Sequence, residues 1–471
     1  MLACGRELPA GGVKRRGQPE MLMLILGRRS RILAALAVSA LFLMLISSCG
    51  AEHTSPPASR EATDLALIHK VVGQVQQSYV RPVDTDALLS DAVKGMVSHL
   101  DPHSEYLDEQ EYQDMMSDSR GEIEGIGVDI DQVKGALLVV TAVDGSPAAR
   151  AGIRSGDRIL KLDQQPISGW TIDALMHRLR GPAGTTVTLT IARDHQASFT
   201  VAVTRALVHF TSVASALEPN EVGYVRISQF TESTPAELTD AIARLKQGRR
   251  LKGFVLDLRD DPGGLLDSAV TVASDFLDGG TVVATHGRSD EDDDVYTAPD
   301  QGDLIRGTPM AVLINGYSAS AAEIVAGALQ DRHRAAVLGT RSFGKGSVQT
   351  IFPLEGHGAL RLTTALYFTP SGRSIQGNGI TPDIVVPLPR DKREAGAVVT
   401  HEGDLPGALT AAALEGTNPA GPAAPSQRLV ASEDEAPIDP AIIGTPMDDQ
   451  LEAALRLVAS HATMRMGLSS H

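Results

Sequence analysis

Hydrophobic and polar positions follow two different periods along the chain. Apolar residues at helical spacing predict a helix from Leu65 and a second from Asp86 to His99, in a region that ends near Ser119. After Gly125 the apolar runs become short and β-branched, which predicts strands separated by glycine turns. In a module of about 85 residues, an ordinary size for a small domain, we expect strands at 136–143, 159–162 and 187–191, and helices at 147–151 and 171–180.

From Gly223 onward, apolar runs alternate with amphipathic stretches, which predicts a layered α/β domain. We expect strands at 223–227, 254–258, 310–314 and 335–338, followed by a strand-rich stretch at 356–368. We expect helices at 235–246, 265–277 and 321–330, and a last amphipathic helix at 448–460. No internal repeat interrupts this order.

The N-terminal segment predicts export. Three arginines (Arg28, Arg29 and Arg31) precede an apolar run from Ile32 to Ile46, which ends in Ser47-Ser48-Cys49. At about 15 residues the run is shorter than the ~20 that a membrane-spanning helix needs. The last four residues resemble a bacterial lipobox, which implies lipidation of Cys49; an uncleaved anchor and a plain signal with an incidental cysteine are the alternatives.

Composition excludes several classes of function. Of the 471 residues, 42% are hydrophobic, as in a globular protein, and 58 acidic against 42 basic residues give a net charge of -16. This balance argues against a broad nucleic-acid surface. The two cysteines, Cys4 and Cys49, cannot form a disulfide framework or a four-cysteine zinc site, and the 13 histidines show no metal-binding spacing. We therefore expect no metal and no cofactor.

Ser320 stands between a predicted strand and a predicted helix. With Glu323 it fits a helix capping box, in which each side chain bonds the other's backbone N–H. The alternative is a serine nucleophile exposed at the strand-to-helix turn, with the Ala321 N–H beside it to stabilise an oxyanion. This segment alone leaves both interpretations open.

Lys345 lies between two glycines in a near match to a phosphate-binding loop, but Gly346 replaces the required Ser or Thr. Glycines allow a lysine to enter a confined site, where burial lowers its pKa and makes it a general base. A surface lysine in a turn is the alternative. If residues 345–350 enter a strand, alternation places Gln349 on the same face as Lys345.

Two glycine-rich loops offer backbone N–H groups. In the first, Asp260-Asp261-Pro262-Gly263-Gly264 follows a buried strand, so it is either a tight turn or a donor to an oxyanion. In the second, Gly125-Ile126-Gly127-Val128 enters a strand and is suited to capture a chain-end carboxylate, with the peptide pairing alongside the strand.

Together and in this order, these motifs resemble the C-terminal processing peptidases, or tail-specific proteases. The resemblance runs from about Leu65 to Pro387 and returns at 450–457. It also includes the motifs at 100–104, 258–264, 318–324, 343–349, 367–372 and 379–383. It implies an α/β multidomain protein, with a ClpP/crotonase-like α/β protease core, an inserted PDZ domain and a small N-terminal helical region.

The resemblance also implies roles for single residues. Ser320 is the nucleophile, Lys345, 25 residues later, is the general base, and Gln349 positions the lysine. Gly264 and Ala321 supply oxyanion N–H groups, with Gly263 a weaker choice for the first. The pair Asp260-Asp261 departs from the Asn-Asn that is more usual in the family.

We divide the chain accordingly. The segments are a signal at 1–49, a linker at 50–62, a helical region at 63–118, a PDZ domain at 119–205, a protease core at 206–394, a flexible Ala/Pro/Gly-rich insert at 395–447 and a helix at 448–471. The expected function is a serine endopeptidase on the periplasmic side of the cell envelope, lipid-anchored, cleaving proteins with free C-terminal tails. A catalytically silent PDZ scaffold is the alternative, and an adaptor protein or a homo-oligomer stays open.

Overall fold

The computed structural model describes residues 60–133, 136–143, 145–170, 172–193, 196–300, 302–389, 399–410 and 442–468. The predicted signal, linker and lipidated Cys49 lie outside these residues. The chain divides into two compact units, one up to Thr85 and one from Asp86 onward. In the first, helix α2 (Arg60–Ser78) carries exposed apolar side chains, including Leu65 and Ile68.

The second unit begins with a small helical region. Helix α3 (Thr85–Val97) is followed by strand β1 (Glu105–Leu107) and helix α4 (Glu109–Ser119). The sequence analysis did not predict α4, although Asp108 and Glu111 form a capping box at its start, with N–H to carboxylate distances of 2.9 and 2.8 Å. The D-x-x-E pattern was the signal that we did not use.

The PDZ-like module is a small sheet with two helices. In the sheet the strand order is β3-β4-β5-β7-β8, which leaves β3 at the edge. Its elements are β3 (Val128–Val133), β4 (Ala136–Ala142), α5 (Pro147–Arg150), β5 (Arg158–Leu162), β6 (Gln165–Pro166), α6 (Ile172–Leu179), β7 (Thr186–Ala192) and β8 (Phe199–Thr204). Strands β2 (Glu122–Gly125) and β9 (Ala206–His209) pair with each other before and after the module. Leu137, Ile159 and Leu175 are fully buried in its core.

The protease core is built on a six-stranded sheet of order β10-β11-β12-β15-β16-β19, parallel except for β10. The strands are β10 (Val213–Glu218), β11 (Val222–Ile227), β12 (Gly253–Asp257), β15 (Met310–Ile314), β16 (Ala336–Gly339) and β19 (Ile384–Val385). Their side chains alternate between two apolar layers, as strand geometry requires. In β15, for example, Val312 and Ile314 pack into one layer, whereas Ala311 and Leu313 pack into the other.

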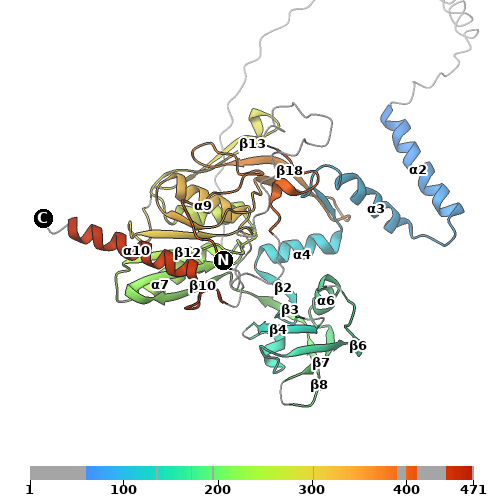
Figure 1. The fold of residues 1–471 in the computed structure, drawn as a ribbon. Coiled ribbons are helices and arrows are strands. Elements are labelled where there is room, and N and C mark those ends of the chain that lie inside the picture. Colours follow the sequence, from blue (N-terminus) through green and yellow to red (C-terminus); the bar gives the residue numbers. More distant parts are fainter. Residues whose placement is uncertain are drawn as a thin grey trace, which may run out of the picture. The chain divides into compact units, whose positions relative to one another are not determined.

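Helices cover both faces of this sheet (Figure 1). On one face lie α7 (Thr234–Lys246), α8 (Leu266–Ser274) and α9 (Ala321–Asp331). On the other lies α10 (Asp449–Leu468), which buries Leu451, Ala454 and Val458 as its spacing predicts. The four inner strands β11, β12, β15 and β16 are therefore buried on both faces, which explains their continuous apolar runs.

The protease core also contains a second sheet. It has the order β1-β18-β13-β14, with β17 paired to β18. Its further strands are β13 (Gly280–Gly287), β14 (Asp294–Ala298), β17 (Ser347–Pro353) and β18 (Ala359–Phe368). None of the helices in the described residues combines the length and the apolar character needed to cross a bilayer.

The prediction of a flexible insert at 395–447 is wrong for part of that segment. Residues 399–410 lie inside the segment 395–447, yet Val399, His401 and Glu402 are buried in the core, and Glu402–Asp404 forms a short 3-10 helix, η4. Low complexity elsewhere in the insert hid this short segment from an analysis based on composition. Residues 395–398 and 411–441 of the insert are outside the described residues.

Candidate active site

Three loops carry the chemistry, and they leave three neighbouring strands. The glycine loop follows β12, the Ser320 turn follows β15 and the Lys345 loop follows β16. Because β12, β15 and β16 are parallel and adjacent, their carboxyl ends meet at one edge of the sheet. Ligand sites in open α/β sheets form at this edge.

Ser320 is held in a strained backbone conformation. Its φ of 53° and ψ of -113° lie outside the regions that non-glycine residues normally occupy. The residue is 8% exposed, so it is less open than the exposed turn that we expected. Such strain persists only where the surroundings impose it, and it concentrates at functional sites.

The glycine loop presses against this turn. A Cβ placed on Gly263 would lie 2.8 Å from Ala319 O and from Ser320 Cβ, and 2.9 Å from Ala321 N. Hydrogen bonds join the same loops: Ala319 N–H donates to Asp261 O at 2.9 Å, and Ser318 Oγ donates to Leu258 O at 2.7 Å. The turn is therefore fixed by contacts from the neighbouring strand end.

Glu323 is the centre of the site, and the sequence analysis had assigned it only a capping role. Its fully buried carboxylate accepts four hydrogen bonds. Oε2 accepts the N–H of Ser320 at 2.8 Å and of Lys345 at 2.9 Å, while Oε1 accepts the Gly344 N–H at 2.7 Å and the Ser342 hydroxyl. One carboxylate oxygen thus joins the backbones of the two predicted catalytic residues. Burial raises the pKa of Glu323 to about 7, against these hydrogen bonds, which favour its ionised form.

Lys345 is half-buried, and its pKa is perturbed in the direction that a general base needs. Burial lowers the pKa of the amine below its ordinary value, and the positive charge of Arg361 lowers it further. The negative charges of Glu402, Glu323 and Glu105 oppose this shift. The lysine therefore lies among charges rather than in the apolar pocket that a simple burial argument suggests.

Within the described residues, no hydrogen bond joins Lys345 Nζ to Ser320 Oγ. Catalytic hydrogen bonds are often long in the absence of substrate and tighten only in the bound complex. The structure therefore brings the two backbones together through Glu323 without showing the dyad closed.

Gln349 lies elsewhere than the alternation argument suggests. Its amide Nε2 donates to Ser347 Oγ at 2.9 Å and to Thr363 Oγ1 at 3.3 Å, and in the described part of the chain it has no hydrogen bond to Lys345. The physical reason is local: Lys345 precedes β17, which begins at Ser347, so strand alternation does not extend to the lysine. The register shift between β17 and β18 skips Thr364 of β18 and places Thr363 opposite Gln349.

The two proposed oxyanion donors belong to the two loops that are in contact: Gly264 follows Gly263 in the glycine loop, and Ala321 follows Ser320. Gly263 N–H donates to Asp261 Oδ1 at 2.8 Å, so it is engaged. In the portion of the chain that the structure describes, neither the Gly264 N–H nor the Ala321 N–H donates a hydrogen bond. An oxyanion hole requires N–H groups without another acceptor, and both of these groups meet that condition.

The second glycine loop has two properties of a peptide site. Gly127 has a φ of 73°, and a Cβ there would lie 2.4 Å from Ser146 Cβ, so only glycine fits. The carbonyls of Ile126 and Gly127 accept the N–H groups of Ala148 and Val143 at 2.8 and 3.0 Å. Strand β3, which starts at Val128, pairs in the described residues with β4 alone, so its other edge is open to an added strand. The Ile126 side chain instead packs in the module's core.

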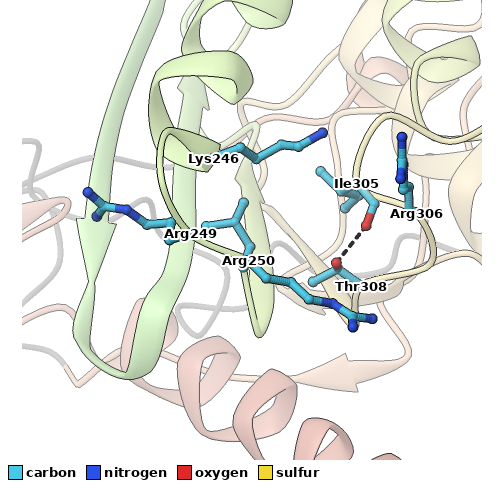
Figure 2. A pocket seen from close by; sticks show the side chains of 7 residues that line it. Lys246, Arg249, Arg250, Ile305, Arg306 and Thr308 are labelled. Carbon is cyan, nitrogen blue, oxygen red and sulfur yellow. Dashed lines mark hydrogen bonds between the residues drawn. The ribbon is translucent and has the colours of Figure 1, made fainter.

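A cavity of about 510 Å³ lies apart from these loops (Figure 2). Its lining consists of Lys246, Arg249, Arg250, Leu251, Ile305, Arg306 and Thr308. None of these is a predicted site residue, and the lining offers no activated nucleophile. This cavity therefore does not mark the active site. No group of three or more His, Cys, Asp or Glu suited to a metal occurs among the described residues.

Three parts of the chain match known protein families. Residues 221–386 match peptidase family S41, residues 138–193 match a PDZ domain, and residues 45–111 match the N-terminal domain of the activating protease CtpB. A carboxy-terminal-processing protease of Bartonella bacilliformis is 46% identical over 71% of this chain and 78% of its own length. The carboxy-terminal processing protease CtpA of Bacillus subtilis is 33% identical over 68% of this chain and 69% of its own length.

Among solved structures, a photosystem II D1 C-terminal processing protease is similar at 29% identity and a TM-score of 0.42, covering 69% of this chain and 93% of that one. The alignments with these two relatives cover more than two thirds of each relative at over 30% identity, and the family match spans the three loops. The chain therefore belongs to peptidase family S41, as a C-terminal processing serine peptidase with a PDZ domain.

Proposed function

We propose that the protein cleaves polypeptides in the cell envelope after its PDZ domain has bound their free C-terminal tails, with Ser320 as nucleophile and Lys345 as general base. One observation carries the catalytic part of this proposal. A single carboxylate oxygen of Glu323 accepts the N–H groups of both Ser320 and Lys345. In this proposal a movement of the lysine side chain brings its amine to the serine hydroxyl.

The reaction follows from the chemistry of the groups. The neutral Lys345 amine takes the proton of Ser320 Oγ as this oxygen attacks the peptide carbonyl. The oxyanion that forms receives the N–H groups of Gly264 and Ala321. The lysine ammonium then protonates the leaving amine, and an ester on Ser320 remains. Water hydrolyses this ester, with Lys345 again taking the proton and Ser320 Oγ receiving it back.

Substrate capture is the task of the loop Gly125–Val128 and the edge of β3. In this proposal the N–H groups of the loop receive the tail's carboxylate, and main-chain bonds to β3 extend the sheet by one strand. For location, we propose an exported protein held on the periplasmic side of the envelope by a lipid on Cys49. The short apolar run and the lipobox-like residues before Cys49 support this location.

The test compares Lys345→Arg, Lys345→Ala and Ser320→Ala with the unmodified protein on a peptide substrate. All three substitutions should abolish cleavage, because arginine stays protonated and cannot take the serine's proton. Binding of the tail to the PDZ domain should persist in each. A silent scaffold also predicts tail binding, but with no cleavage by the unmodified protein and therefore no effect of any of the three substitutions. Full activity of Lys345→Arg near pH 7 would exclude the lysine mechanism.

A further inference from the structure

Residues 399–409 reach the catalytic loop although they are remote from it in sequence. We call this segment the active-site strap. Two hydrogen bonds attach it to the residues before Lys345: Glu402 N–H donates to Phe343 O at 3.0 Å, and His401 Nδ1 lies 3.1 Å from Ser342 O. The His401 and Glu402 residues are 2% and 0% exposed, so these contacts are buried.

The carboxylate of Glu402 joins two distant parts of the chain. It accepts His103 Nε2 at 2.7 Å and Gln376 Nε2 at 2.9 Å. His103 belongs to the Leu100–Ser104 motif, and Gln376 follows the second sheet. A buried carboxylate is stable only when donors such as these compensate its lost hydration.

Gln376 carries the connection back to the catalytic loop. Its Oε1 accepts the Gly346 N–H at 2.9 Å, while its Nε2 also donates to Leu409 O at 3.1 Å, near the end of the strap. Glu323 holds the Gly344 N–H from the other side. Lys345 therefore lies between two glycines, each fixed by a chain of hydrogen bonds that ends in a buried carboxylate.

The strap also contacts the loop that leads to Ser320. Val399 is 3% exposed, and a Cβ placed on Gly316 would lie 2.5 Å from Val399 Cγ1 and 3.4 Å from its Cβ. The strap thus touches the loops of both predicted catalytic residues.

We propose that the active-site strap positions the Lys345 loop for catalysis, with Glu402 as the positioning residue that connects His103 and Gln376 to it. This inference rests on the proposed function, since it assumes that Lys345 is the base. It assigns a role to a segment that composition alone assigns to a flexible insert. It also assigns a role to His103, as the hydrogen-bond partner of the Glu402 carboxylate beside the active site.

Charge distinguishes this role from packing alone. The groups that act on the Lys345 amine are Arg361 on β18, Glu105 on β1, Glu323 on α9 and Glu402 on the strap. Glu402 raises the pKa of Lys345, so removing its charge lowers that pKa and leaves more neutral lysine at a given pH. The acid limb of the activity profile should then move to lower pH.

The first experiment compares Glu402→Gln with Glu402→Ala. Alanine leaves His103 and Gln376 without an acceptor, so we expect kcat to fall about tenfold or more, with KM changed little. Glutamine can accept one of these donors and donate to a His103 ring nitrogen, so it should recover most of kcat while the acid limb moves to lower pH. Glu237→Ala, on α7, is the control for loss of a carboxylate with several hydrogen bonds; it should leave kcat and the pH profile unchanged.

Wild-type kcat and pH profile in Glu402→Ala would overturn the proposal. So would a loss in Glu402→Gln as large as in Glu402→Ala with no shift of the acid limb, because that pattern indicates folding alone. Failure of the proposed function is separately visible: cleavage by Ser320→Ala or Lys345→Arg would then persist, whatever Glu402 does.

The second experiment tests whether the strap stays in contact with the loop that leads to Ser320 during turnover. Gly316→Cys with Val399→Cys places two sulfurs on Cβ atoms about 3.4 Å apart, close to the ~3.5–4.5 Å of a disulfide. The chain's own cysteines, Cys4 and Cys49, precede the described residues, and Val399→Cys alone is the control. Oxidation should leave activity equal to that of the reduced form or raise it. A loss on oxidation that reduction restores would show that the strap must leave the site, and would overturn the proposal.

Discussion

Replacing Glu323 by glutamine should separate the assembly of this active site from its folding. The carboxylate accepts the N–H groups of Ser320, Gly344 and Lys345 and the hydroxyl of Ser342. Glutamine has almost the same shape but offers one oxygen and one NH₂ group. Its oxygen can replace Oε2 and keep the N–H groups of Ser320 and Lys345. Its NH₂ must then face the Gly344 N–H, donor against donor.

The size of the effect follows from this geometry. The Ser342 hydroxyl can rotate to accept from the new NH₂, so only the Gly344 contact is lost outright. A buried N–H without an acceptor costs about 1–3 kcal/mol, and we expect Glu323→Gln to lower the free energy of unfolding by that amount. Activity should fall as well, because the broken contact lies next to Lys345. We expect kcat/KM to fall about tenfold or more, because the same loss of about 1–3 kcal/mol would then raise the activation free energy.

The assay is peptide cleavage together with denaturant unfolding, for Glu323→Gln and for a matched control. Glu237 also accepts four hydrogen bonds in the first turn of its helix, from Ser212 N–H and Oγ, Val213 N–H and Ser233 Oγ. Three of these reach Oε2, and Oε1 accepts only the Ser233 hydroxyl, which can rotate. Glu237→Gln should therefore keep both stability and kcat/KM. If Glu323→Gln also keeps wild-type kcat/KM, Glu323 does not hold the catalytic loop and the reasoning is wrong.

The same variant gives a pH test with a definite sign. Burial raises the pKa of Glu323 to about 7 from an ordinary value of 4.5, so the folded protein holds this proton more tightly than the unfolded chain. The resulting stability is full below pH 4.5 and is lost as the pH rises to about 7, by roughly 3 kcal/mol. Glu323→Gln cannot titrate, so the stability of the wild type relative to this variant should fall by that amount between pH 4.5 and 7. A gap that widens with pH would contradict the raised pKa.

Three further predictions test the glycine loop, the peptide site and the location. Gly263→Ala should abolish cleavage, because its φ of 98° and the contacts near 2.8 Å exclude a Cβ; Gly372→Ala, with a φ of 80° and open space, is the control and should stay active. Amidating a substrate's C-terminus should slow its cleavage, and equal rates for free and blocked tails would refute capture by Gly125–Val128. Cys49→Ser should release the protein from membranes or leave its precursor uncleaved; an unchanged mass and membrane fraction would disprove lipidation.

Much of the core could be predicted because its signals are local. Strand β15 lies at 310–314 as expected, since five consecutive apolar residues bounded by polar ones indicate a strand buried on both faces. The helix after Ser320 begins at Ala321, as its cap and periodicity predict. The two interpretations of Ser320 also prove compatible, because Glu323 bonds the serine's N–H while the residue keeps a strained conformation.

The parts that escaped prediction depend on contacts between remote residues. The direction of the Gln349 amide depends on a register shift between β17 and β18, which no periodicity within 345–350 reveals. Thr363, which receives this amide, also donates to Asp101 at 3.1 Å, so the Leu100–Ser104 motif acts on the site from outside the protease core. The strap is a still longer connection, since Glu402 pairs with His103.

The position of Lys345 presents a conflict of charges that the fold resolves through the backbone. A base must be neutral, so a neutral partner such as Gln349 suits it better than a carboxylate, which raises its pKa. The structure instead surrounds the loop with Glu323 and Glu402, both fully buried. The Glu323 carboxylate accepts hydrogen bonds from N–H and hydroxyl groups, and its pKa of about 7 reduces its charge at neutral pH. Arg361 and burial act on the amine in the opposite direction to both carboxylates. Glu323 binds the backbone of the lysine loop directly and Glu402 reaches it through Gln376, although both raise the pKa of the amine. Burial and Arg361 outweigh them, so the pKa of Lys345 stays below its ordinary value.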